Sequence, residues 1–143
     1  MRHCKYTFKL GRNSSHRKAL IANMLKALVE HGRIETTVTK AKEMRRYADR
    51  LITIAKKDTL ASKREAASKL RLRYNTLSSK EKRAAKGGDT SAYNTDRTLL
   101  NKLYTDYAHR FKERQGGYTR VLKLDYTRTG DGSPRAILEF LPE

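Results

Sequence analysis

The apolar residues of this chain change their spacing along the sequence, and that change constrains the fold more than any single motif does. Over 16–31, and again within 40–113, apolar side chains recur at the three- and four-residue spacing of a helix that faces a core. Over 33–39, 118–128 and 135–141 they alternate with polar residues, as in a half-buried strand. A group of helices between strands predicts a small α+β domain in the order α-β-α-α-α-β-β, with a three-stranded sheet covered by helices.

The same spacing predicts which side chains face the core. In the helices these are Leu20, Ile21, Met24, Leu25, Leu28, Ala41, Met44, Ala48, Leu51, Ile52, Ala55, Ala66, Leu70, Tyr74, Leu77, Leu99, Leu100, Leu103, Tyr104, Tyr107 and Phe111. In the last two strands they are Leu122, Leu124 and Tyr126, and Ala136, Leu138 and Phe140. The glycine-rich turn at 130–134 predicts that these two strands form an antiparallel hairpin, and 86–94 reads as a loop.

Short polar signals predict where the helices begin and end. Gly32 ends the first helix, because glycine adopts the left-handed conformation without a Cβ penalty. Thr39 is the expected cap of the second helix, with Glu43 in its first turn. The pattern Ser62–Glu65 predicts a capping box for a helix that continues to Leu77, and Ser78–Glu81 repeats the pattern for a short basic turn.

The charge of the chain is large and unevenly distributed. Its 143 residues carry 33 Lys and Arg against 15 Asp and Glu, a net charge of +18. The first acidic residue is Glu30, a second basic block runs over 40–86, and the segment 130–143 is mildly acidic. A body this cationic is stabilised by a polyanion, which indicates nucleic acid first and a membrane surface second. For any one cation over 56–86 a solvated helix face is the simpler interpretation.

Several protein classes are not expected. One cysteine allows no intrachain disulfide, no stretch approaches the ~20 apolar residues of a membrane span, and no apolar secretory segment follows the first residues. The expected setting is a reduced intracellular compartment. No set of Cys and His has metal-ligand spacing, Gly87-Gly88 lacks a P-loop lysine, and the histidines are isolated, so neither cofactor, metal nor enzymatic activity is expected.

The positive features suit folded RNA. Tyr6, Phe8 and Tyr118 lie among basic residues, where an exposed ring could stack on an unpaired base, although core packing is an equal alternative for Tyr6 and Tyr118. An irregular basic arm over 1–14 followed by a single domain over 15–143 fits the surface of folded RNA. A DNA-compacting protein of the nucleoid type remains the alternative.

Short motifs, in order, resemble the bacterial large-subunit ribosomal protein seventeen family. They are M-R-H at 1–3, L-G-R at 10–12, H-R-K-A-L at 16–20, N-M at 23–24, R-I-E-T-T at 33–37, K-A-K-E at 40–43, L-I-T-I-A-K at 51–56, R-Q-G-G-Y-T-R-V at 114–121 and G-D-G-S-P at 130–134. Each motif is weak alone, but the ordered set is specific. Residues 58–97 are longer than in many members, so no contact is carried over there.

The resemblance implies a structural component of the large ribosomal subunit, located in the cytoplasm within the ribosome. It implies a two-layer domain with a mixed three-stranded sheet. It also implies binding to large-subunit ribosomal RNA near the polypeptide exit region, with neighbouring ribosomal proteins as further partners. No membrane and no small-molecule substrate is implied. The RNA-binding residues expected are Arg2, His3, Lys5, Lys9, Arg12, His16, Arg17, Lys18, Lys40, Lys42, Arg45, Arg46, Tyr118 and Arg120.

Overall fold

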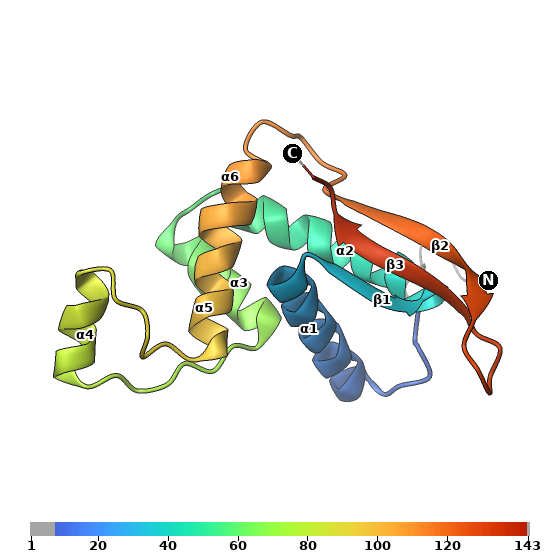
Figure 1. Cartoon of the computed structure of the whole chain (residues 1–143), viewed down its shortest axis with the longest axis horizontal. Helices are drawn as coiled ribbons and strands as arrows, with labels where there is room; N and C mark the ends of the chain where they lie inside the picture. Colours follow the sequence, from blue (N-terminus) through green and yellow to red (C-terminus); the bar gives the residue numbers. More distant parts are fainter. Residues whose placement is uncertain (1–7, 143) are drawn as a thin grey trace.

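The computed structural model describes residues 8–142 and contains a three-stranded sheet with α2 packed across one face (Figure 1). The strands are β1 (Arg33–Thr37), β2 (Thr119–Thr127) and β3 (Pro134–Phe140), in the spatial order β1-β3-β2. The helices are α1 (Ser14–His31), α2 (Val38–Ala55), α3 (Leu60–Leu70), α4 (Ser79–Lys86), α5 (Thr95–Lys102), the π-helix η1 (Leu103–Tyr107) and α6 (Ala108–Arg110). The α+β class and the order of elements are confirmed, and the basic turn expected after Ser78 is the helix α4.

Both strand pairings in the sheet are antiparallel. Arg33 lies opposite Glu139 where β1 pairs with β3, and Thr119 lies opposite Phe140 where β2 pairs with β3. The mixed sheet implied by the family resemblance is therefore wrong. The two strands that run in the same direction, β1 and β2, are separated by β3, so no parallel pair forms hydrogen bonds.

The ends of α1 are fixed by its own sequence. The Asn13 side chain accepts a hydrogen bond of 2.8 Å from the His16 amide, which satisfies one of the free amides of the first turn. Gly32 adopts φ +76° and donates its amide to Leu28 O at 2.8 Å, as the sequence predicts. Because Gly32 stops the helix without a loop, β1 begins one residue later.

The second helix begins earlier than expected. Val38 is its first residue and Thr37 is the cap, so the prediction that Thr39 caps α2 is wrong. With this earlier start Glu43 falls beyond the first turn, so its predicted place there is also wrong, and the side chain is only 1% exposed. Its Oε2 accepts a 3.5 Å hydrogen bond from the Phe8 amide, and within the described residues its Oε1 has no partner.

The third helix is shorter than the apolar spacing predicts. Its capping box joins Thr59 and Ser62, not Ser62 and Glu65, because the helix starts at Leu60. It ends where Arg71 takes the left-handed conformation, φ +52°. The predicted continuation of the helical stripe beyond Leu70 is therefore wrong, and the segment that follows runs out from the body (Figure 1).

A long helical rod made of α5, η1 and α6 packs against the other helices and reaches the sheet. Its buried residues follow one another at intervals of four: Leu99, Leu103, Tyr107 and Phe111. A four-residue step overshoots an α-helical turn by about 40°, and the wider π-helical turn of η1 absorbs this drift. Tyr107 packs its ring 4.5 Å from that of Phe140, so the rod is joined to the central strand.

Leu103 provides the test of this core. It is fully buried, and its replacement by alanine is expected to lower the free energy of unfolding by about 2–5 kcal/mol, because transfer and cavity terms add. Leu60→Ala is the matched control, since Leu60 is 65% exposed. Chemical denaturation of both variants measures the difference, and equal stability of the two would place Leu103 outside the core.

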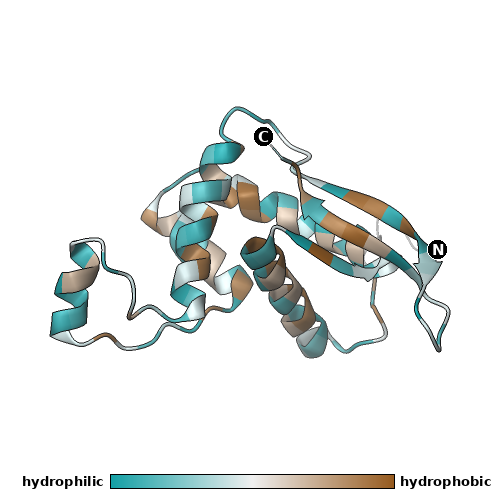
Figure 2. Cartoon of the chain, in the orientation of Figure 1, coloured by the Kyte–Doolittle hydropathy of each residue, from teal (hydrophilic) through white to brown (hydrophobic). Residues whose placement is uncertain are grey.

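The apolar face of β2 differs from the prediction. Leu122 and Tyr126 are 43% and 53% exposed, while Thr119 is buried and Val121 half-buried toward α2. The register explains this, since Thr119 and Val121 lie opposite the buried Phe140 and Leu138, and a bulge follows Lys123. The prediction that Leu122 and Tyr126 face the core is wrong. Figure 2 shows apolar residues along β2, which is an edge strand of the sheet.

Within residues 8–142 no helix is both long and apolar enough to cross a membrane.

Candidate nucleic-acid interface

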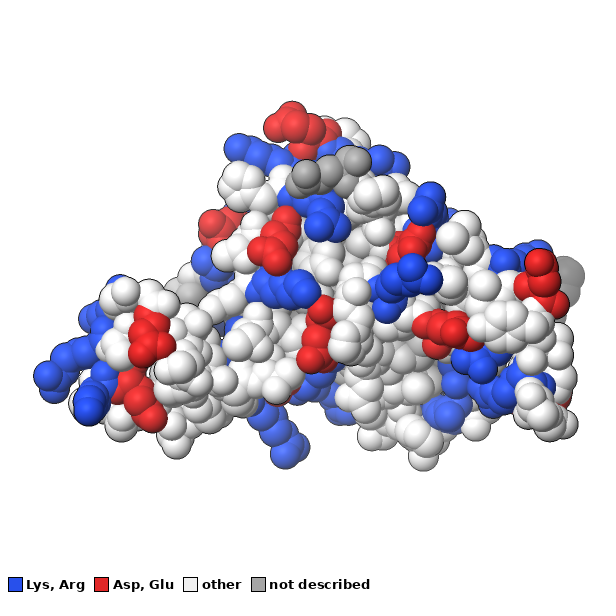
Figure 3. Space-filling view, viewed as in Figure 1, with Lys and Arg blue, Asp and Glu red and all other residues white. Residues whose placement is uncertain are grey.

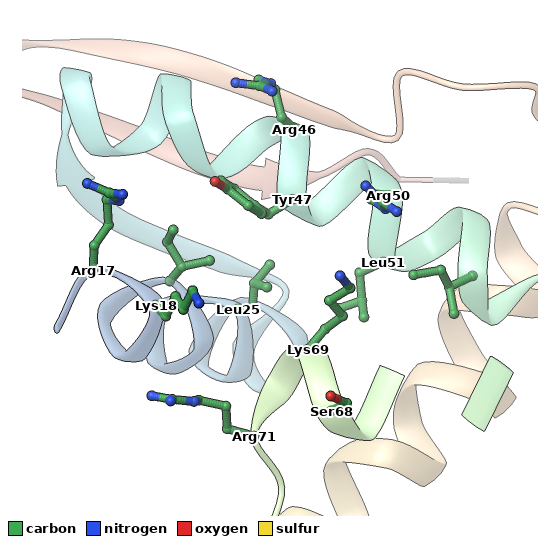
Figure 4. Close-up of a pocket in the computed structure, with 12 residues that line it drawn as sticks. Arg17, Lys18, Leu25, Arg46, Tyr47, Arg50, Leu51, Ser68, Lys69 and Arg71 are labelled. Carbon is green, nitrogen blue, oxygen red and sulfur yellow. The ribbon is translucent and has the colours of Figure 1, made fainter. Parts of the chain in front are cut away.

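A groove of about 550 Å³ lies where α1, α2 and α3 converge (Figure 4). The groove is lined by residues of all three helices and by the residue that follows α3. They are Arg17, Lys18, Ile21, Leu25, Arg46, Tyr47, Arg50, Leu51, Ile54, Ser68, Lys69 and Arg71. Figure 4 shows these side chains around one hollow, with Tyr47 directed from α2 toward α1. The groove therefore depends on the packing of three helices that are not contiguous in the sequence.

The lining of the groove has two chemical parts. Its apolar part consists of the buried side chains Ile21, Leu25, Leu51 and Ile54. Its charged part consists of six cations, Arg17, Lys18, Arg46, Arg50, Lys69 and Arg71, and none of the lining residues is acidic. Such an arrangement produces a positive potential that is concentrated in a concave surface with an apolar wall.

Local helix geometry explains how the cations reach one place. Arg46 and Arg50 are separated by four residues on α2, so they lie on the same side of that helix. The left-handed conformation of Arg71 ends α3 beside the groove. Arg46 Nη1 lies 3.8 Å from Glu43 Oε2. Within residues 8–142 no carboxylate lies within ion-pair distance of the other five: Arg17, Lys18, Arg50, Lys69 and Arg71.

Tyr47 is the aromatic residue of the groove and is half-buried. Burial raises the pKa of its hydroxyl, and the Glu43 carboxylate adds to that rise, while Arg46 and Arg17 oppose it. The hydroxyl is therefore protonated at neutral pH and can donate a hydrogen bond. A half-exposed ring next to guanidinium groups can pack against a base or a ribose while the cations bind phosphates.

The structure places the predicted RNA-binding residues in several locations. Arg17, Lys18 and Arg46 line the groove. Arg2, His3 and Lys5, together with Tyr6, lie outside the described residues. Lys9 and His16 are exposed near the start of α1, where Arg12 donates to Leu10 O at 3.0 Å and to His16 Nε2 at 3.4 Å.

The remaining predicted residues do not reach the groove. Three of them lie on α2 but do not line the groove: Lys40, Lys42 and Arg45. Arg120 forms an ion pair with Glu139 on the open face of the sheet. Tyr118 is 2% exposed and packs its ring 5.2 Å from that of Phe111, so the expected exposed stacking ring is not present and the core-packing alternative holds.

Sequence reasoning missed four residues of the groove: Tyr47, Arg50, Lys69 and Arg71. The four-residue spacing of Arg50 from Arg46 was the available signal. No local signal marks Lys69 or Arg71, because their position depends on how α3 packs beside α1 and α2. Within residues 8–142 no three Cys, His, Asp or Glu side chains gather closely enough to hold a metal ion.

Comparison with known proteins identifies the family of the chain. The model of the family described as ribosomal protein L17 matches residues 20–141. "Large ribosomal subunit protein bL17" of Chlamydia pneumoniae is 55% identical over 141 residues, which is 99% of each chain. The protein of the same name from Chlamydia caviae is 54% identical over 143 residues, all of both chains. These matches confirm the resemblance drawn from the ordered motifs: the chain belongs to the ribosomal protein L17 family.

Proposed function

We propose that this protein is a structural constituent of the large ribosomal subunit, not an enzyme, and that it binds large-subunit ribosomal RNA near the polypeptide exit region. The observation that carries the RNA-binding proposal is the groove, in which six cations surround an apolar wall without one acidic neighbour in the lining. Full-length relatives named as large-subunit proteins support the ribosomal role. The position near the exit region rests on the family resemblance.

The mechanism proposed is binding without chemistry. Arginine side chains bind phosphate oxygens in a bidentate manner, and lysine side chains add point charges. Each phosphate that is neutralised releases counterions, which favours association. Because the groove is formed by three packed helices, the backbone positions from which its cations extend are fixed relative to one another, and the RNA strand bound there would adopt a matching geometry during assembly.

The basic N-terminal arm, residues 1–14, would extend the same interface. Lys9, Arg12 and His16 precede the groove cations Arg17 and Lys18 along the chain, and this stretch of sequence contains no acidic residue. In this proposal the arm enters the folded RNA, and the groove binds the surface of the same RNA. Arg2, His3 and Lys5 are the proposed contacts at the beginning of the arm, and Lys40, Lys42 and Arg45 are secondary ones.

Neighbouring ribosomal proteins are proposed to contact the open face of the sheet. There Arg120 pairs with Glu139, and Arg135 Nε lies 2.7 Å from Glu35 Oε1. The charges on this face are therefore largely balanced, which makes it a poor site for phosphates. Leu122 and Tyr126, both exposed, give it an apolar component that suits a protein surface.

Sedimentation of a cell extract tests the proposal against a DNA-compacting protein of the nucleoid type. A ribosomal constituent is expected to move with the large subunit at moderate salt and to remain there after DNase treatment. Recovery with the nucleoid, together with equal affinity for any duplex DNA, would instead support the alternative. A crosslinking map of the protein on the ribosomal RNA tests the proposed position near the exit region.

The affinity for RNA is expected to depend steeply on salt. If the arm and the groove together neutralise roughly six to ten phosphates, the binding constant falls about 10³- to 10⁵-fold between 50 and 200 mM monovalent salt. Filter binding with a fragment of the large-subunit RNA at four or five salt concentrations gives the slope. A flat dependence would contradict an interface built on phosphate contacts.

A further inference from the structure

The segment 71–94, which we call the finger, projects away from the body and carries α4 at its far end (Figure 1). It leaves at the end of α3 and returns at the start of α5. Connections of this length are uncommon in compact domains, and those that occur often have a function. The groove does not include any finger residue apart from Arg71 at its base, so the proposed function leaves the finger unexplained.

Helix α4 is ordered without packing against the body. None of its eight residues is buried. Its beginning is stabilised locally by a capping box, in which the Ser78 amide donates to Glu81 Oε2 at 2.7 Å and the Glu81 amide donates to Ser78 Oγ at 3.3 Å. Helices this short are marginal in water without tertiary packing. Its surface is therefore available to a partner that would supply the missing contacts.

The root of the finger is held by side-chain hydrogen bonds, which limit the directions in which the finger can extend. Asn75 Nδ2 donates to Ala92 O at 2.8 Å, and Asn94 Nδ2 donates to Arg73 O at 2.7 Å, which ties the outgoing segment to the returning one. Arg97 of α5 joins the outgoing segment to the body through hydrogen bonds of 3.0 Å to Asn75 Oδ1 and 2.9 Å to Asn75 O.

A second set of contacts fixes the same root. Asp96 accepts hydrogen bonds from the Arg73 amide at 2.6 Å and from Lys26 Nζ at 2.8 Å, so the finger is joined to α5 and α1. The guanidinium of Arg97 lies close to two finger rings, 4.9 Å from the Tyr74 centroid and 5.4 Å from that of Tyr93. Anchoring the root reduces the conformational entropy that the finger loses when it binds, which favours a binding role.

The chemistry of α4 selects the kind of partner. It exposes four cations, Lys80, Lys82, Arg83 and Lys86, against one acid, Glu81, whose carboxylate is engaged in the cap. Figure 3, viewed as in Figure 1, shows Lys and Arg side chains that protrude at the left end of the molecule, where α4 lies. The helix carries no large apolar residue, whereas a protein groove that accepts a helix requires apolar anchors at helical spacing. Phosphates are the better complement.

The surface next to the root has a related character. A cleft of about 310 Å³ opens between the finger and the helices α3 and α5. Two tyrosine rings, Tyr74 and Tyr93, contribute to its lining together with Arg64 and with Lys63, whose ammonium forms an ion pair of 2.8 Å with Asp58. Cations beside aromatic rings provide phosphate contacts and a face for a base or a sugar.

We propose that the finger is a second, preorganised RNA-binding element, which places α4 against the phosphates of an RNA segment separate from the one bound at the groove. This inference rests on the proposed function for the identity of the polyanion. It predicts two footprints from one small protein. The anchored root would then set the distance between them, so the protein would fix two parts of the RNA relative to one another.

Directed hydroxyl-radical cleavage tests the finger and the groove separately. The background is Cys4→Ser, which removes the native cysteine. Single cysteines are then introduced by Lys82→Cys in α4 and Ser68→Cys in the lining of the groove, and each carries an iron chelate. Thr129→Cys in the hairpin turn is the control. With the labelled proteins assembled into the large subunit, probes at 68 and 82 are each expected to cut a compact but different set of ribosomal RNA nucleotides. Cleavage from 68 without cleavage from 82 would overturn the finger proposal and leave the proposed function intact. Cleavage from neither position would contradict both.

A charge variant adds an energetic readout. Replacing Lys80, Lys82 and Arg83 together with alanine is expected to lower the slope of log affinity against log salt by about 2, since three phosphate contacts are lost. Alanine is a strong helix former, so α4 should persist in circular dichroism. An unchanged slope would overturn the proposal. A crosslink from position 82 to a ribosomal protein, in place of RNA, would also overturn the proposal.

Discussion

A variant in which Arg17, Arg50 and Arg71 are all replaced by alanine is expected to bind large-subunit ribosomal RNA about 10³-fold more weakly at low salt. The three residues come from three different places in the chain and line one groove. A hydrogen bond to a charged group contributes about 1.5–3 kcal/mol, and each 1.4 kcal/mol corresponds to a factor of ten in affinity. Three phosphate contacts therefore account for about three powers of ten, and the salt slope should fall by about 2–3.

The matched control changes the same net charge outside the groove. Arg33, Lys112 and Lys123 are exposed and do not line it. Their joint replacement by alanine should weaken binding by less than about tenfold, because only the long-range field is reduced and salt screens it. If both triple variants lost affinity equally, binding would depend on net charge alone, and the groove would not be the site. Thermal unfolding of both variants checks that the loss is not a folding defect.

Removal of residues 1–12 is expected to weaken RNA binding by about 10²- to 10⁴-fold while the fold is retained. The removed segment carries four cations, Arg2, Lys5, Lys9 and Arg12, and each phosphate contact contributes to affinity and to its salt dependence. The cut is placed before Asn13 because that side chain caps α1, and a longer deletion would destabilise the helix by about 1 kcal/mol. Filter binding and circular dichroism measure the two effects.

One contact of the removed segment reaches the core and needs its own control. The Phe8 amide donates to the buried Glu43. The truncated protein therefore exposes a carboxylate that is otherwise covered, and a Glu43→Gln version of it removes that charge. Both truncated proteins are expected to show the same loss of RNA affinity. Full affinity in the truncated chain would mean that the arm is a solvated tail.

The elements of this fold could be predicted because their signals are local. Gly32 marks the end of α1, and the Ser78–Glu81 box marks the start of α4, since each acts within one turn of helix. The outer face of β2 could not be predicted from alternation. Leu122 and Tyr126 alternate as core residues do, but which face is buried depends on where α2 packs.

The groove was predictable only in part, for the same reason. Arg17 and Lys18 belong to the acid-free beginning of the chain, which marks them directly. Lys69 and Arg71 belong to a mixed basic stretch, where a solvated face is the default interpretation. They become groove residues only through the left-handed turn that ends α3 and the convergence of three helices. Side chains that gather through tertiary packing leave no mark in sequence spacing.

The central position of β3 has a consequence for how the protein is made. The strand that joins both sheet pairings is also the last one synthesised, so β1 has no hydrogen-bonded neighbour until Pro134–Phe140 has been added. Contacts between residues so distant in sequence close slowly, and an unpaired edge can associate with other chains in the meantime. Each newly made molecule therefore passes through an interval in which its helices can form but its sheet cannot. A nascent chain released early, before residue 134, would keep most of its cations and lack the strand that completes its core.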